Sequence, residues 1–110
     1  MATGRLGTQQ LTSGAIGTYT NCYQVPTNYY SVFNISLTNT ASSAVTVRVA
    51  LSTSSSSPST SEFIEYGATI QPNGVFERTG IVLNSNLYVL VSTTGTALNV
   101  NIWGIETSTT

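Results

Sequence analysis

The chain of 110 residues contains no histidine, no lysine and no aspartate. Three arginines and four glutamates are its only charged side chains, so charged residues make up 6% of the sequence, against roughly 25% in ordinary soluble domains. Proton transfer, metal binding and phosphate binding depend largely on the missing residue types. The composition therefore argues against an enzyme, and we expect no catalytic residue, no metal site and no cofactor.

A nearly neutral chain also excludes some partners. With a formal net charge of -1, three arginines cannot form the basic stripe that displaces counterions from nucleic acid, so we expect no direct nucleic-acid binding. The sequence shows neither a signal peptide nor an apolar run as long as a transmembrane helix, which predicts a protein that is made in the cytoplasm, is not secreted and does not enter a membrane. Weak charge repulsion between copies favours self-association.

The glutamates leave one catalytic alternative, a pair of carboxylates of the kind that glycosidases use. Glu62 and Glu65 are three residues apart, which places them on opposite faces of a strand. Glu77 could join one of them only through strand pairing, and together with the adjacent Arg78 it is better interpreted as a solvated or inter-subunit polar pair. An enzyme is the least favoured class.

The strongest positive pattern is the alternation of apolar and polar residues, which is typical of half-buried strands. Phe33, Ile35 and Leu37 alternate with polar residues, and the segment 45–51 repeats the pattern with valines. The polar residues 39–43 between them predict a turn, so we expect these two strands to form one hairpin.

Further strands are predicted at 9–15, 18–25, 63–70, 75–83, 87–91 and 98–106, with proline, asparagine and glycine in the intervening turns. About eight short strands and no helical pattern predict an all-β, antiparallel β-sandwich, either jelly-roll-like or Ig-like, in a single domain over residues 1–110. The Ser-rich segment 52–61 is predicted to be a mobile loop, or else an arm that orders against a neighbouring subunit. Flexible termini are expected at 1–7 and 107–110. The lone Cys22 is expected to be a small buried hydrophobic residue.

Aromatic residues are the best candidates for a contact surface, because tyrosine and tryptophan are enriched where proteins bind other molecules. Four tyrosines cluster between positions 19 and 30, and Trp103 lies out of phase with its apolar neighbours, so it should point outward. The candidate interface residues are Tyr29, Tyr30, Glu77, Arg78 and Trp103.

Most of the chain between Tyr19 and Glu106 resembles small β-sandwich proteins encoded among the virion genes of tailed bacteriophages, particularly marine and cyanobacterial ones. The resemblance rests on the segments Tyr23–Pro26, Phe33–Ile35, Ala44–Val49, Phe63–Tyr66, Ile70–Leu83 and Val100–Ile105. It implies a capsid decoration or cement protein, made in the host cytoplasm and located on the capsid surface of the virion. Its partners would be the major capsid protein and further copies of itself, expected as a homotrimer. A neck, tail or fibre accessory module, and a carbohydrate-binding module that contacts surface glycan, stay open as alternatives.

Overall fold

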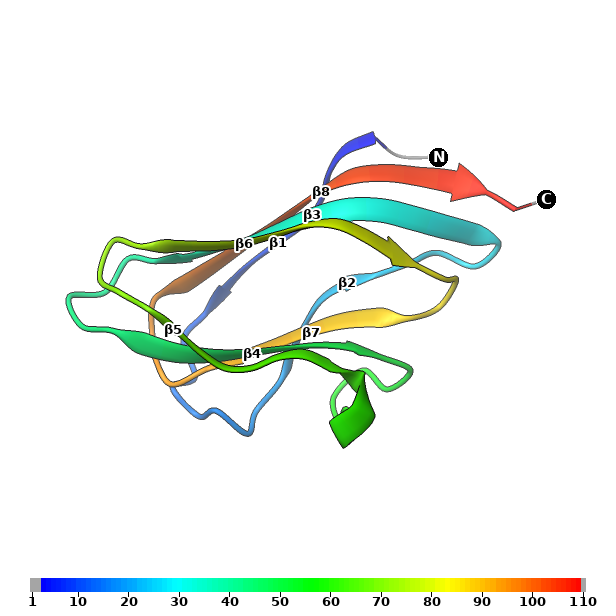
Figure 1. Ribbon diagram of the computed structural model, residues 1–110. Helices are drawn as coiled ribbons and strands as arrows, with labels where there is room; N and C mark the ends of the chain where they lie inside the picture. Colours follow the sequence, from blue (N-terminus) through cyan, green and yellow to red (C-terminus); the bar gives the residue numbers. More distant parts are fainter. Residues whose placement is uncertain (1–2, 110) are drawn as a thin grey trace.

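Eight strands form two antiparallel four-stranded sheets that pack face to face as a β-sandwich, as predicted (Figure 1). The computed structural model describes residues 3–109. Within that range no helix is long and apolar enough to cross a membrane. The elements are β1 (Thr3–Leu11), β2 (Thr20–Gln24), β3 (Tyr29–Asn39), β4 (Val45–Ser52), η1 (Thr60–Glu62), β5 (Phe63–Ile70), β6 (Val75–Leu83), β7 (Tyr88–Thr93) and β8 (Leu98–Ser108).

The strand order is that of a jelly roll rather than an Ig-like fold. Sheet A has the order β1-β8-β3-β6, and sheet B has the order β2-β7-β4-β5. The chain follows the path of one long hairpin, in which the first strand pairs with the last, the second with the seventh, the third with the sixth and the fourth with the fifth. Rolling up this hairpin adds the pairs β3·β8 and β4·β7. The tip of the hairpin is the β4–β5 connection, which holds the Ser-rich segment.

The predicted hairpin between residues 33–38 and 45–51 is wrong, because β3 lies in sheet A and β4 lies in sheet B. Alternation determines which side chains of a strand are buried, but it carries no information about the neighbouring strand. The first strand also lies closer to the N-terminus than predicted, at Thr3–Leu11 instead of 9–15. Of the termini expected to be flexible, residues 3–7 pair in β1 and residues 107 and 108 in β8, whereas residues 1, 2 and 110 lie outside the described range.

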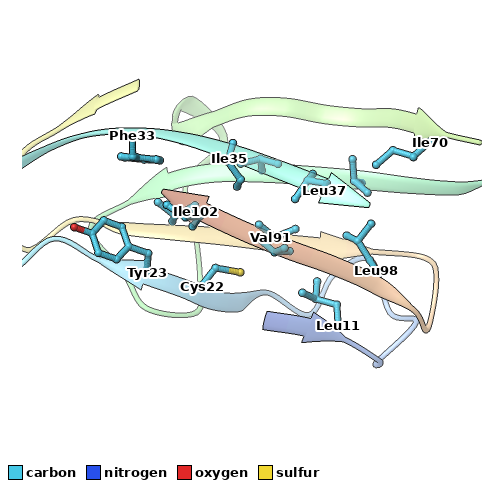
Figure 2. Packing of buried hydrophobic residues seen from close by; sticks show 14 of the residues in the cluster. Leu11, Cys22, Tyr23, Phe33, Ile35, Leu37, Ile70, Val91, Leu98 and Ile102 are labelled. Atoms are coloured by element: carbon cyan, nitrogen blue, oxygen red, sulfur yellow. The ribbon is translucent and has the colours of Figure 1, made fainter. Parts of the chain in front are cut away.

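The core forms between the inner faces of the two sheets, where side chains from both layers point toward one another (Figure 2). β3 and β8 pair without interruption over the whole length of both strands, and their inward-facing residues are almost fully buried. Cys22 is buried among them, as predicted. The largest fully buried side chains of this core are Phe33, Ile35, Leu37, Leu98 and Ile102.

All four edge strands carry β-bulges, whereas the two central ladders, β3·β8 and β4·β7, are regular. The registers of β1, β2, β5 and β6 each shift against the adjacent inner strand, with two shifts in the β4·β5 pair. Bulges twist an edge away from the flat geometry that another strand could extend. The edges of this sandwich are therefore poor sites for strand addition.

Two close contacts join the sheets along their long sides. On one side, a Cβ at Gly7 would lie 2.4 Å from the carbonyl oxygen of Cys22, so only glycine lets β1 approach β2 this closely. On the other side, Arg78 of β6 forms an ion pair with Glu65 of β5 and donates to the carbonyl oxygen of Ile64 at 3.2 Å. The arginine is partly exposed, so this ion pair contributes at most about 1 kcal/mol.

Gly104 generates a stability prediction. A Cβ at this position of β8 would lie 2.1 Å from the carbonyl oxygen of Val32 on β3. Gly104→Ala must push the two central strands of sheet A apart, so we expect the free energy of unfolding to fall by about 2 kcal/mol or more in urea denaturation. The matched control is Gly17→Ala, where a Cβ would meet no atom within 4 Å. Equal stabilities of the two variants would contradict this account of β3–β8 packing.

Candidate interaction surface

The outer face of sheet A carries an apolar patch that spans three strands. The strand registers place Val82 of β6 beside Val32 of β3, and Val32 beside Ile105 of β8, so these three form one row across the sheet. Tyr30 and Trp103 lie on the same face, each two residues along its strand from this row. Tyr30 lies on one side of the row, and Trp103, which is paired with Asn34, lies on the other. The apolar patch therefore consists of Tyr30, Val32, Val82, Trp103 and Ile105.

Most of the apolar patch is open to solvent. The exposed fractions are 62% for Val82, 46% for Ile105, 38% for Tyr30 and 36% for Trp103, and Val32 at the centre is half-buried. Apolar side chains that gather on one sheet face are a common mark of a binding surface, whereas single exposed ones are ordinary. Further along the same face, β3 and β8 bear hydroxyls and amides, whereas β6 bears Glu77 and the exposed Val75.

The structure separates the five interface residues predicted from the sequence. Tyr30, Trp103 and Glu77 share the outer face of sheet A. Arg78 points to the opposite side of β6, where it pairs with Glu65, so Glu77 and Arg78 do not act as a unit. Tyr29 packs partly against the core at the end of the sandwich.

Sequence reasoning missed Val32, Val82 and Ile105. Each is an apolar residue at a position where the alternation of its strand calls for a polar one, next to a buried or inward-facing neighbour. That departure from the pattern was the available signal. It could not show that the three residues form one row, because the registers of β3 with β6 and β8 are set by the fold.

The outer face of sheet B is covered rather than bare. Ala50, Leu90 and Ser92 are fully buried there, although they point away from the main core. Tyr19, at the end of the β1–β2 segment, contacts the Phe63 side chain of β5 over this face, and Figure 1 shows both the β1–β2 segment and η1 on the far side of sheet B. The Ser92 hydroxyl has no hydrogen-bond partner among residues 3–109.

An aromatic cluster with one arginine forms this cover. The rings of Tyr19 and Phe63 lie 5.8 Å apart, and those of Phe63 and Tyr66 lie 4.8 Å apart, nearly edge to face. The Arg48 guanidinium stands 4.1 Å above the Tyr66 ring and donates to the Tyr19 hydroxyl at 3.3 Å. Arg48 is thus held by a cation–π contact, and Tyr66, 63% exposed, forms the outer surface of the aromatic cluster.

A buried polar contact joins the two sheets within the core. The Tyr23 hydroxyl of β2 donates to Oε2 of Glu106 on β8 at 2.5 Å, and Ser31 Oγ lies 3.3 Å from the same hydroxyl. Burial, together with the bond to Glu106, raises the pKa of Tyr23 above its ordinary range, so the phenol remains a donor. Burial likewise raises the pKa of Cys22 to about 12, which keeps its thiol protonated and unreactive at neutral pH.

An open depression of about 460 Å³ adjoins the apolar patch at the end of the sandwich. Tyr29, Tyr30 and Val82 form its apolar wall, and Asn84, Ser85 and Thr109 supply polar groups. Of the residues that the structure describes, no charged one lines this depression. Within residues 3–109, no three cysteine, histidine, aspartate or glutamate side chains lie close enough together to hold a metal ion.

The three glutamates considered for a glycosidase-like pair of carboxylates lie in different parts of the structure. Glu65 contacts Arg78 between the sheets, Glu77 lies on the outer face of sheet A, and Glu62 lies in the loop that connects β4 and β5.

No protein-family model, curated protein or solved structure matches the chain.

Glu62 organises the Ser-rich segment that the sequence predicted to be a mobile loop. Its Oε1 accepts from the Ser52 hydroxyl at 2.7 Å and from the Ser59 N–H at 2.9 Å, and its Oε2 accepts from the Thr53 N–H at 3.3 Å. The carboxylate closes the loop by binding both of its ends. The bonds from Ser52 and Ser59 lower the pKa of Glu62 below its ordinary value of 4.5.

This lowered pKa predicts a pH-dependent loop. The stabilisation is fully present above pH 4.5, the value for an unperturbed glutamate, and is lost as the pH falls through the lowered pKa of the folded state. We expect the amide signals of Thr53 and Ser59 to shift together in an NMR titration over the acid range below pH 4.5. In Glu62→Gln this coupled shift should be absent. Loop amides that titrate identically in both proteins would show that Glu62 does not close the loop.

Proposed function

We propose that the protein is a non-enzymatic structural protein of a bacteriophage virion, which binds the capsid shell as a homo-oligomer and stabilises it. The observation that carries the proposal is the exposure of aromatic side chains on two opposite faces of a sandwich whose smallest extent is 19 Å. Tyr30 and Trp103 lie on sheet A, and Tyr66 lies on sheet B. A subunit with two such faces is suited to contact a copy of itself on one side and the shell on the other.

Fold and composition support this proposal. Jelly rolls are frequent in viral capsid proteins and also occur in lectins, so the fold is compatible with the role but does not specify it. The resemblance to virion proteins favours the capsid. The scarcity of charge leaves a surface of hydroxyls, amides and aromatic rings, which loses little hydration free energy on contact with a protein lattice.

We assign shell binding to the aromatic cluster on sheet B. Tyr66 is a large exposed side chain that is already oriented by Phe63 and Arg48, so little side-chain entropy remains to be lost when it binds. Aromatic residues held in this way are typical anchors of interfaces. The partner in the shell is the major capsid protein, and stabilisation arises because each bound copy buries surface on neighbouring shell subunits.

Co-sedimentation with undecorated shells tests the proposal. We expect the purified protein to pellet with the shells, and Tyr66→Ser to bind about tenfold more weakly or worse, because the anchor is lost. Tyr66→Phe keeps the ring and should retain most of the affinity. Shells that already carry their decoration are the negative control. If the native protein stays in the supernatant at every concentration, the protein is not a shell-binding protein.

The depression beside the apolar patch favours a second candidate function, binding of a neutral glycan. Tyrosine rings and uncharged hydrogen-bonding groups, as found around Tyr29, Tyr30, Asn84 and Ser85, are the groups that recognise sugars without charge. A glycan array should then give a signal that Tyr30→Ala abolishes and Ser55→Ala leaves unchanged. An array without signal would remove this candidate.

A further inference from the structure

Two of the seven charged side chains differ from the other five in their contacts. Arg48, Glu62, Glu65, Arg78 and Glu106 all have a hydrogen-bond, ion-pair or cation–π partner within the chain. Arg5 and Glu77 are exposed, and within residues 3–109 neither takes part in an ion pair. The two residues left over are of opposite sign.

Arg5 and Glu77 lie on the same surface, the outer face of sheet A, at its two opposite edges. Arg5 of β1 is paired with Trp103, and Glu77 of β6 is paired with Ser36. Three strand spacings separate β1 from β6, about 14 Å, so the two side chains cannot meet within one chain. The strands between them, β8 and β3, carry most of the apolar patch.

We infer that the outer face of sheet A binds the same face of a second copy across a two-fold axis that runs along the strands, between β8 and β3. Such an axis lays β1 of each copy over β6 of the other, and β8 over β3. Ile105 then faces Val32 of the second copy, and the apolar row is buried against itself. The contact is isologous and closes as a dimer.

The charges select this axis over the other two-fold arrangement of the same faces. An axis across the strands would lay β1 over β1 and β6 over β6, so that Arg5 approaches Arg5 and Glu77 approaches Glu77. The axis along the strands instead brings Arg5 of each copy toward Glu77 of the other. Arg5 and Glu77 then lie two residues apart along the strand direction. This offset is about 7 Å, which an extended arginine side chain can span.

The size of the face and the state of the edges agree with this contact. Four strands at a spacing of about 4.8 Å, the longest of 11 residues, give a face of roughly 700 Å². A standard interface buries about 800 Å² on each partner, so the contact requires the whole face, including its charged edges. The bulges on β1 and β6 disfavour the competing mode, strand addition at the edges.

The inference rests on the proposed function only in that the working form is an oligomer. It assigns the face of sheet A to a second copy and leaves the aromatic cluster on sheet B free for the shell. It also replaces the homotrimer expected from the sequence with a two-fold dimer. An isologous contact joins copies in pairs, so it cannot by itself close a ring of three.

Charge reversal tests the contact, with the mass in solution measured by sedimentation equilibrium. We expect the native protein to be a dimer, and Arg5→Glu and Glu77→Arg each to weaken dimerisation about tenfold or more, because each change creates two like-charge contacts. The double variant, which carries both changes, should recover an affinity within about threefold of the native one. Ser55→Glu, in the exposed Ser-rich loop, is the control for altered net charge and should dimerise normally.

Ile105→Glu places a charge in the apolar row, opposite Val32 of the second copy, and should be monomeric while keeping the native circular dichroism spectrum. A native protein that stays monomeric, a trimer that is insensitive to charge reversal, or a double variant no better than the single ones would each overturn the inference. The shell assay separates the two proposals. A monomer that pellets with shells refutes the dimer and leaves shell binding standing, whereas a charge-dependent dimer that does not bind shells refutes shell binding and leaves the dimer standing.

Discussion

The uninterrupted pairing of β3 with β8 is the constraint on which the rest of the molecule depends. Its two strands are the longest in the fold and lie side by side at the centre of sheet A. One side of this ladder supplies Phe33, Ile35 and Ile102 to the core. Its other side supplies Trp103 and Ile105 to the apolar patch, so a single register sets both the core and the candidate contact surface.

Polar contacts refine a structure that apolar burial builds. Glu106 and Tyr23 join the sheets inside the core, and Glu65 and Arg78 join them at one open side. Each bond links segments far apart in the chain. In a protein with so few charges, nearly every ionic group thus holds strands or loops together. Arg5 and Glu77 are informative because they are exposed and form no ion pair with any residue between 3 and 109.

The location of the strands and the burial of their faces were largely predictable. The alternation in residues 33–38 and 45–51 placed β3 and β4 correctly, and the apolar residues of 98–106 correctly identified the inward face of β8 and the outward Trp103. The predicted pairing of β3 with β4 was wrong, and Glu77 and Arg78, interpreted from the sequence as one polar pair, lie on opposite sides of β6. Both depend on which strands become neighbours, which adjacent residues do not reveal.

Sequence by itself determined that the chain is an all-β sandwich with little charge, because period-two alternation and composition are local properties. The tertiary structure alone decided the jelly-roll order, the bulged edges, the closure of the 52–61 segment by Glu62, and the row formed by Val82, Val32 and Ile105. Strand partners are chosen by the burial of both sheets at once, a property of the whole chain. For this reason only the folded molecule shows which of the few charged residues and exposed apolar residues share a face.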